Sequence, residues 1–229
     1  MYFDYYYLIL VVPMLLLSLY AQFKVKSTYS KYSKVANSRH LTGESAARML
    51  LSAGGVSGVR VERISGELTD HYDPKADTIR LSDGVYNSTS IAAIGIACHE
   101  AGHAMQYHTS YVPIKFRMTL VPICNFASKL SLPLMLLGVI LNFGSLALIG
   151  VIAFGIANLF ELVTLPVEFN ASRRAIKAIE DNNFLYGDEV KAAKKVLSAA
   201  ALTYVAALAV AIANFLRYLI IFGSNRRRD

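Results

Sequence analysis

The sequence has few cysteines and no pattern that would organise them. Its two cysteines, Cys98 and Cys124, lie in apolar surroundings and form no Cys-x-x-Cys pair. A disulfide framework or a thiolate metal site therefore has no support. Cys98 directly precedes a histidine, but we expect it to be a small buried hydrophobic residue. The chain also lacks internal repeats and low-complexity segments.

The N-terminus lacks the basic start and the small-residue cleavage site of a secretory signal peptide. It carries Asp4 instead, and tyrosines flank the apolar run from Leu8 to Leu19 on both sides. Tyrosine belts of this kind are typical of the membrane interface. We therefore interpret residues 5–23 as a retained anchor helix, bent at Pro13.

Apolar residues are abundant and concentrated in long runs. Hydrophobic residues make up 55% of the 229 residues and the mean hydropathy is +0.41, whereas soluble proteins contain roughly 45–50% apolar residues. After the anchor, residues 118–167 are apolar almost throughout and predict a helical hairpin with arms 121–141 and 146–165 around Asn142–Ser145. A last run, 196–216, ends beside Arg217, which could extend its side chain to the headgroups.

The net charge of +7 does not indicate nucleic-acid binding, because the basic residues gather beside the apolar runs. Basic residues in these places meet anionic lipid headgroups and set the orientation of the chain. The sequence thus predicts the lipid bilayer as a partner, and no nucleic acid. The basic regions after the first run and around Arg173–Lys195 predict that the polar segments face the cytoplasm.

The polar segment before the hairpin combines helical and strand patterns. Residues 42–51 have helical spacing, residues 59–64 alternate, and residues 70–81 read as two short strands around Pro74. Ser88 or Ser90 caps a helix that runs from about Ile91 through Met105.

One pentad on this predicted helix, His99-Glu100-Ala101-Gly102-His103, has the pattern of a metal-binding site. Residues four apart lie one turn apart on the same face, so both imidazoles can reach one metal ion. Glu100 then lies beside the open metal position, where it can take a proton from zinc-bound water. The small residues around the histidines allow close packing. The pattern predicts a zinc peptidase with ligands His99 and His103 and catalytic base Glu100.

A catalytic zinc needs a third protein ligand. The other three histidines, His40, His71 and His108, do not stand at the spacing of a third histidine in metzincin-type sites. The other standard choice is a glutamate on a later helix. Glu168, just after the hairpin, fits well, whereas Glu161 lies two turns earlier, at or inside the membrane boundary.

Several segments of this chain resemble the bacterial YugP-type neutral zinc metallopeptidases of the membrane. The segments are Ala21 to Tyr29, Asp70 to Pro74, the pentad, and Glu168-Phe169-Asn170-Ala171-Ser172. The order of strand hairpin, pentad helix, membrane hairpin and Glu-Phe-x-Ala helix is more distantly similar to the HtpX and CAAX prenyl-protease group.

The resemblance implies a mainly α membrane protein that carries a zincin-like α+β catalytic domain with a short strand hairpin. It implies one zinc ion, with Glu168 as the third ligand. The relatives usually have Asp where this chain has Ser172. They place a substrate-binding edge strand near His71 and Tyr72, for which an oxyanion or substrate role is one hypothesis and stabilisation of the adjacent turn is the other. Arg173, beside a span, is a candidate for contact either with an oxyanion or substrate carboxylate or with lipid headgroups.

These patterns together predict the following organisation. Residues 1–23 form the anchor, and residues 118–167 form the membrane hairpin. The catalytic domain has two parts, residues 24–117 and residues 168–195. Residues 196–229 form a last membrane helix with a basic tail.

The predicted function is a multi-pass cell-membrane zinc endopeptidase that cuts proteins or peptides at the membrane surface, with its catalytic domain in the cytoplasm. Two alternatives stay open. The pentad helix has a short apolar front, which argues against an intramembrane protease. The intact Glu100 argues against a catalytically silent scaffold. No pattern supports a homo-oligomer or a regulatory membrane partner.

Overall fold

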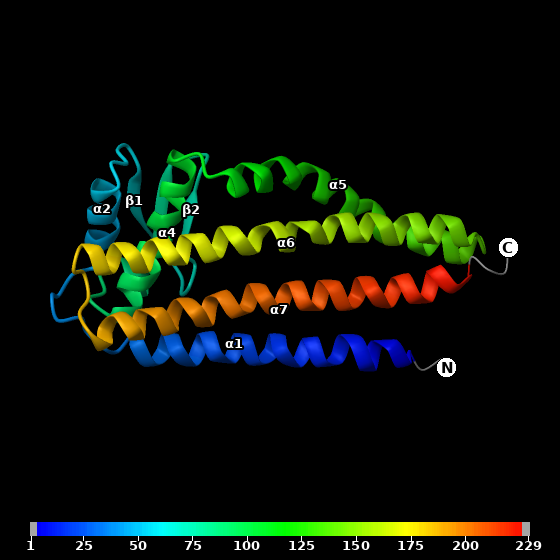
Figure 1. Cartoon of the computed structure of the whole chain (residues 1–229), viewed down its shortest axis with the longest axis horizontal. Helices are drawn as coiled ribbons and strands as arrows, with labels where there is room; N and C mark the ends of the chain where they lie inside the picture. Colours follow the sequence, from blue (N-terminus) through cyan, green and yellow to red (C-terminus); the bar gives the residue numbers. More distant parts are fainter. Residues whose placement is uncertain (1–3, 226–229) are drawn as a thin grey trace. The chain divides into compact units, whose positions relative to one another are not determined.

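The computed structural model describes residues 4–225 and consists mainly of helices (Figure 1). Its elements are a π-helical turn η1 (Tyr7–Val11), α1 (Val12–Tyr32), α2 (Gly43–Ala53), β1 (Arg60–Ile64), β2 (His71–Asp73), β3 (Thr78–Ser82), α3 (Asp83–Tyr86), α4 (Ile91–His108), α5 (Val112–Ile140), α6 (Gly144–Asp181) and α7 (Asp188–Asn225). The basic tail predicted at residues 226–228 lies outside the described residues. The chain folds into two compact units, each built from segments that are distant in sequence.

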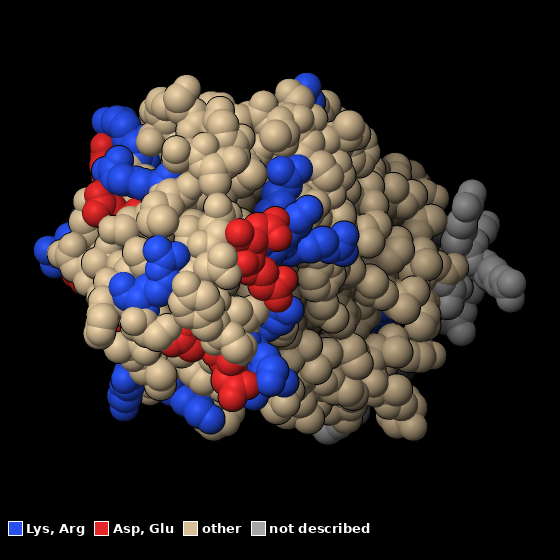
Figure 2. Space-filling model, turned by 60° about the vertical axis from the view of Figure 1, so that its left-hand side comes forward, with Lys and Arg blue, Asp and Glu red and all other residues tan. Residues whose placement is uncertain are grey.

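The first unit is formed, within the described residues, by segments 4–21, 115–165 and 203–225. Among the described residues, four helices are long and apolar enough to cross a membrane: Tyr7–Tyr32, Val112–Ile140, Gly144–Asp181 and Asp188–Gly223. Large side chains such as Leu19, Phe126 and Ile140 are exposed on them. Figure 2 shows charged side chains gathered on one part of the visible surface, beside a broad area with almost none. This is the surface of a mainly α membrane protein.

Local sequence explains how the helices of this unit form and pack. The π-helical turn ends at Val11, two residues before Pro13, whose missing N–H and bulky ring disturb the preceding turn. The turn between α5 and α6 falls at residues 141–143, where Asn142 has a φ of +50°. At Gly138 a Cβ would lie 2.3 Å from the backbone nitrogen of Ala147, so the two arms approach as closely as glycine permits. Arg217 forms an ion pair with Asp4.

The second unit comprises residues 22–114 and 166–202. Its three-stranded sheet has the order β1-β3-β2: β2 is antiparallel to β3, and β1 is parallel to it with Val61 opposite Ile79. The two strands around Pro74 follow the prediction, whereas the parallel pairing of β1 was not predicted. Apolar residues from the sheet and from several helices form one core; Leu50, Ile79, Ile94 and Phe184 are among its fully buried members.

Capping residues fix where the helices of this unit begin. Thr42 accepts a hydrogen bond from the backbone N–H of Ser45 at the start of α2. Ser90 accepts one from the N–H of Ala93 and is therefore the N-cap of α4, one of the two predicted candidates. Several helices extend further than the apolar pattern predicts. α1 continues to Tyr32, and α6 runs on through Pro166 to Asp181.

Candidate metal centre

The two histidines of the pentad lie side by side on α4. This helix is buried on most of its surface, including Cys98, Glu100 and Gly102. The i, i+4 spacing brings the rings of His99 and His103 to a centroid distance of 4.7 Å, nearly perpendicular to one another. Their side chains are only 14% and 13% exposed. Cys98 is buried, as predicted, and burial raises the pKa of its thiol, which makes it inert.

Glu168 of α6 brings a carboxylate to the same point. Its Oε2 lies 3.4 Å from Nε2 of His99 and 3.5 Å from Nε2 of His103. Four ligands held at about 2.1 Å in a tetrahedron are about 3.4 Å apart, so the carboxylate oxygen has the spacing of a zinc ligand from each imidazole nitrogen. Among the described residues, this is the one group of His, Cys, Asp and Glu side chains whose ligand atoms converge within 4.8 Å.

Hydrogen bonds on the far side of each imidazole orient the ring. The side-chain nitrogen of Gln106 donates to the carbonyl of Val167 and to Oδ1 of Asn170. Its oxygen therefore faces Nδ1 of His103, at 3.0 Å, and accepts the proton from that nitrogen. This leaves Nε2 of His103 with a free electron pair, which is the tautomer that a metal ligand needs.

His99 has a corresponding partner in Ser172. The Ser172 hydroxyl lies 3.1 Å from Nδ1 of His99. Ser172 is the position at which the sequence departs from the motif expected from the resemblance. Its hydroxyl nonetheless gives the His99 ring a polar partner. Gln106 and Asn170 were not predicted. The i+3 position of Gln106 relative to His103 was the signal that could have found it.

Burial and nearby charge act in opposite directions on His103. Burial is the largest effect and favours the neutral ring. The hydrogen bond with Glu168 and the carboxylates of Glu100 and Glu168 outweigh it, so the pKa of His103 is raised. A metal ion that binds here must displace a proton that the carboxylates favour.

Close backbone packing holds α4 against α6. A Cβ placed on Gly102 would lie 2.8 Å from the carbonyl oxygen of Ala171. Ala171 is fully buried and lies between Glu168 and Ser172 on the sequence of α6. Gly102 therefore permits the close contact between α4 and α6 that brings Glu168 to the histidines. Glu100 itself is 8% exposed.

The comparison with protein families agrees with this geometry. Residues 7–223 match the family described as "Putative neutral zinc metallopeptidase". The chain belongs to this family. It is also 48% identical over 222 residues to the "Putative membrane protease YugP" of Bacillus subtilis (strain 168), covering 96% of this chain and 98% of that protein. No solved structure matches the chain at a significant level.

Membership of this zinc metallopeptidase family gives the coarse function, and the resemblance seen in the sequence is confirmed. Three predicted residues remain. His71 and Tyr72 lie in β2, and Arg173 lies on α6. β2, which carries the first two, is an edge strand of the sheet and packs on the pentad helix α4.

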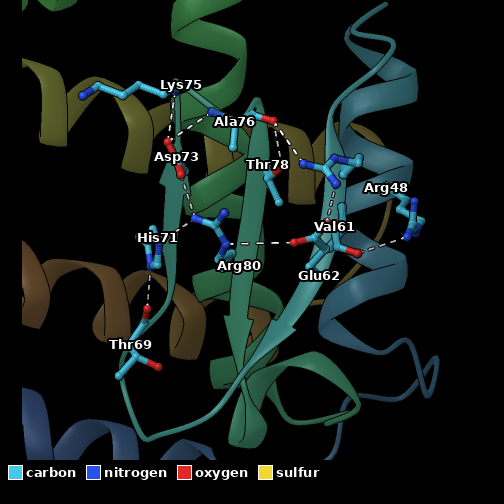
Figure 3. A network of polar contacts seen from close by, with 11 residues as sticks. Arg48, Val61, Glu62, Thr69, His71, Asp73, Lys75, Ala76, Thr78 and Arg80 are labelled. Carbon is cyan, nitrogen blue, oxygen red and sulfur yellow. Dashed lines mark hydrogen bonds and ion pairs between the residues drawn. The ribbon is translucent and has the colours of Figure 1, made fainter.

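In this structure, His71 and Tyr72 have partners within the sheet region. Figure 3 shows His71 between Thr69 and Arg80; its Nδ1 lies 2.8 Å from the carbonyl of Thr69. The Tyr72 hydroxyl donates to Asp77, and its ring contacts that of Tyr107 on α4. These contacts hold β2 against α4. A substrate role for either residue stays a prediction.

Arg173 and its neighbour Arg174 differ in their surroundings. Arg173 is exposed on α6, so its role in substrate binding also stays a prediction. Arg174 donates to Oδ1 of Asn170, the amide that also accepts from Gln106. Arg174 therefore belongs to the hydrogen-bonded group that ends at His103.

Proposed function

We propose that this protein is a membrane-bound zinc endopeptidase that hydrolyses peptide bonds of proteins or peptides at the membrane surface. The observation that carries the proposal is the convergence of Nε2 of His99, Nε2 of His103 and a carboxylate oxygen of Glu168, next to Glu100 on the same helix. Two imidazoles and one carboxylate are the ligand set of catalytic zinc sites that keep one position open.

The residues present fit one zinc ion. Their donor atoms are of the type zinc prefers, their spacing suits tetrahedral coordination, and the Nδ1 atom of each histidine has a polar partner. When bound, zinc would supply a Lewis acid that makes water more acidic and polarises the scissile carbonyl.

Glu100 is the residue that we propose as general base. It follows His99 directly on α4, and it is not among the three residues whose ligand atoms converge. In this position its carboxylate can remove a proton from the attacking water and deliver it to the leaving amine. Burial at 8% exposure limits competition from bulk water.

The substrate is proposed to bind as an extended chain along the sheet. β2 is an edge strand and lies against α4, so its backbone could pair with a peptide and align the scissile bond with the metal centre. In this arrangement His71, Tyr72 and Arg173 are candidates for contacts with the substrate or the oxyanion.

Two features support an active site outside the hydrocarbon. α4 is not among the four candidate spans found in the described residues, and the unit that contains it has a charged surface with ion pairs such as Arg80–Asp73. This favours cleavage at the membrane surface over intramembrane proteolysis. The basic segments beside the spans favour a cytoplasmic position.

The decisive test changes Glu100 and Glu168 separately in the full-length protein. Because Glu100 is a base and not a ligand, Glu100→Gln should retain zinc while peptide hydrolysis in detergent falls by about 10²-fold or more. Glu168→Ala should lose zinc, whereas Glu161→Ala, a matched change earlier on α6, should keep it. Metal content and hydrolysis are measured on the same preparations.

Either of two results would contradict the proposal. If Glu100→Gln cleaves as fast as the parent, hydrolysis does not use this carboxylate. If Glu168→Ala keeps its zinc and Glu161→Ala loses it, the third ligand has been misidentified.

A further inference from the structure

A groove of about 570 Å³ lies between α1 and α7, and it shares no residue with the metal centre. All of its lining residues belong to the second unit. They are Lys24, Ser27, Thr28, Lys31 and Tyr32 of α1, and Lys194, Lys195 and Ser198 of α7. Nothing in the proposed peptidase mechanism uses this groove.

The lining is strongly one-sided in charge. It contains four lysines and no carboxylate. Glu180 pairs with Lys194 at 2.8 Å from outside the lining and offsets part of this charge. The Lys31 ammonium lies 5.3 Å from the centre of the Tyr32 ring, which orients it by a cation–π contact. Lysines from two helices that face one hollow favour an anionic ligand.

Hydroxyl groups complement the lysines. Thr28 and Ser198 face the groove from opposite helices, and Ser27, whose hydroxyl donates to the Lys24 carbonyl, lines it too. Neutral hydroxyls beside ammonium groups are suited to a phosphate, whose several oxygens accept more hydrogen bonds than a carboxylate does. The lining therefore favours a phosphate group over other anions.

Packing beneath the groove keeps its two walls together. Tyr29 of α1 and Val196 of α7 are buried against Ala92 of α4 in a small apolar cluster, with Tyr32 at its margin. The spacing of the lysines is thus set by the fold and does not have to be created when a ligand binds, which lowers the cost of binding.

The position of the groove along the chain indicates where the phosphate comes from. Lys24 directly follows the apolar run of α1, and Lys195 directly precedes the apolar run that begins at Val196 of α7. Both walls therefore stand at the border between polar and membrane-spanning residues, at the depth of lipid headgroups. Basic pockets between membrane helices at this depth bind anionic headgroups.

We propose that the groove between α1 and α7 binds the phosphate of an anionic phospholipid headgroup. The lysines would contact the phosphate oxygens and Thr28 and Ser198 would donate hydrogen bonds, while the acyl chains extend into the hydrocarbon of the bilayer. Free phosphate has the same chemistry at its oxygens but no acyl chains, so the test separates the two sources.

The test measures lipid binding to the full-length protein in detergent by native mass spectrometry. Phosphatidylglycerol, phosphatidylcholine and inorganic phosphate are each titrated at matched ionic strength. The parent should bind phosphatidylglycerol more tightly than phosphatidylcholine. The double variant Lys31→Gln/Lys195→Gln should bind phosphatidylglycerol about 25-fold more weakly, at about fivefold for each lysine.

Two matched variants control for net charge and for folding. Lys26→Gln/Lys191→Gln removes two charges from the same helices outside the groove and should bind within about twofold of the parent, because diffuse surface charge is screened. Lys31→Arg/Lys195→Arg keeps both charges and should also bind like the parent.

Equal losses of affinity in the two glutamine double variants would rule out the groove as the lipid-binding site. Binding of inorganic phosphate as tight as that of phosphatidylglycerol would overturn the lipid headgroup as its ligand. The readout is binding, so it does not depend on peptidase activity.

Discussion

At the scale of single residues, the proposed metal centre depends on groups that are not themselves ligands. The Ser172 hydroxyl lies 3.1 Å from Nδ1 of His99 and holds that ring in place. We expect Ser172→Ala to lower zinc affinity by about tenfold or more, since loss of a partner to a ligand histidine costs 10–100-fold. The affinity is measured by competition with a chromophoric chelator.

Ser172→Asp is the matched comparison for this experiment. A carboxylate accepts the Nδ1 proton more strongly than a hydroxyl does, so this variant should bind zinc at least as tightly as the parent. A purely structural role for Ser172 predicts the reverse order, because aspartate is larger than alanine. Equal zinc affinity in the alanine variant and the parent would show that the contact is not used.

The same residues show how far a site can be predicted from a sequence. His99 and His103 follow from their spacing alone, because a helix places residues four apart on one face. Glu168 and Glu161 could not be separated by spacing, since the choice depends on where α6 meets α4. Gln106 lies three residues from His103, but its role depends on Val167 and Asn170, which are more than 60 positions away. Such contacts are invisible without the fold.

At the scale of elements, the approach of α4 to α6 decides whether three ligands converge. Gly102 leaves no room for a side chain, because a Cβ there would meet the Ala171 carbonyl at 2.8 Å. Backbone cannot give way cheaply, so Gly102→Ala should push the helices apart. We expect weaker zinc binding and a cost of about 1–3 kcal/mol in the free energy of unfolding, as overpacking usually causes.

Gly95 of α4 provides the matched control. A Cβ at Gly95 would lie 3.6 Å from the Ala193 side chain, an ordinary van der Waals distance. Gly95→Ala should therefore keep zinc affinity and gain up to about 1 kcal/mol from the better helix propensity of alanine. Chelator competition and thermal unfolding are measured for both variants. If both substitutions act alike, the effect belongs to helix propensity and not to the contact.

Elements that are determined by neighbouring residues were predicted well. Elements that depend on contacts distant in sequence were not. The cap at Ser90 and the strands around Pro74 depend on neighbouring residues, and the structure contains them. The parallel pairing of β1 with β3 was missed, because nothing near Val61 specifies which strand it joins. The extension of α1 to Tyr32 was missed as well, since its polar residues end the apolar pattern without ending the helix.

At the scale of the whole molecule, the metal centre constrains how the chain crosses the membrane. The pentad and Glu168 are separated in sequence by an apolar stretch of about 50 residues, yet they share one cluster of ligand atoms. They can do so only if that stretch crosses the membrane an even number of times. α5 and α6 supply two candidate spans, which meets this condition, whereas a single span would forbid it.

Four spans and the distribution of basic residues then predict the orientation of the protein. Lysines follow the first span, and further basic residues lie within the segment Arg173–Lys195. The turn between α5 and α6 carries no basic residue. Because cytoplasmic loops are enriched in Lys and Arg, the unit with the metal centre should face the cytoplasm, with the N-terminus and the turn outside. Four spans would place the three arginines at 226–228 outside, against this rule. The larger set of basic residues on the metal-centre side should dominate.

Labelling of single cysteines tests this orientation directly. Lys31→Cys reports on the metal-centre side and Ser145→Cys on the turn; both positions are exposed, and both native cysteines are buried and should react slowly. In intact cells a membrane-impermeant maleimide should label position 145 and leave position 31 unlabelled. Both should react after permeabilisation, which shows that position 31 is accessible once the barrier is removed. Labelling of position 31 in intact cells would reverse the orientation and place the metal centre, with its substrates, outside the cell.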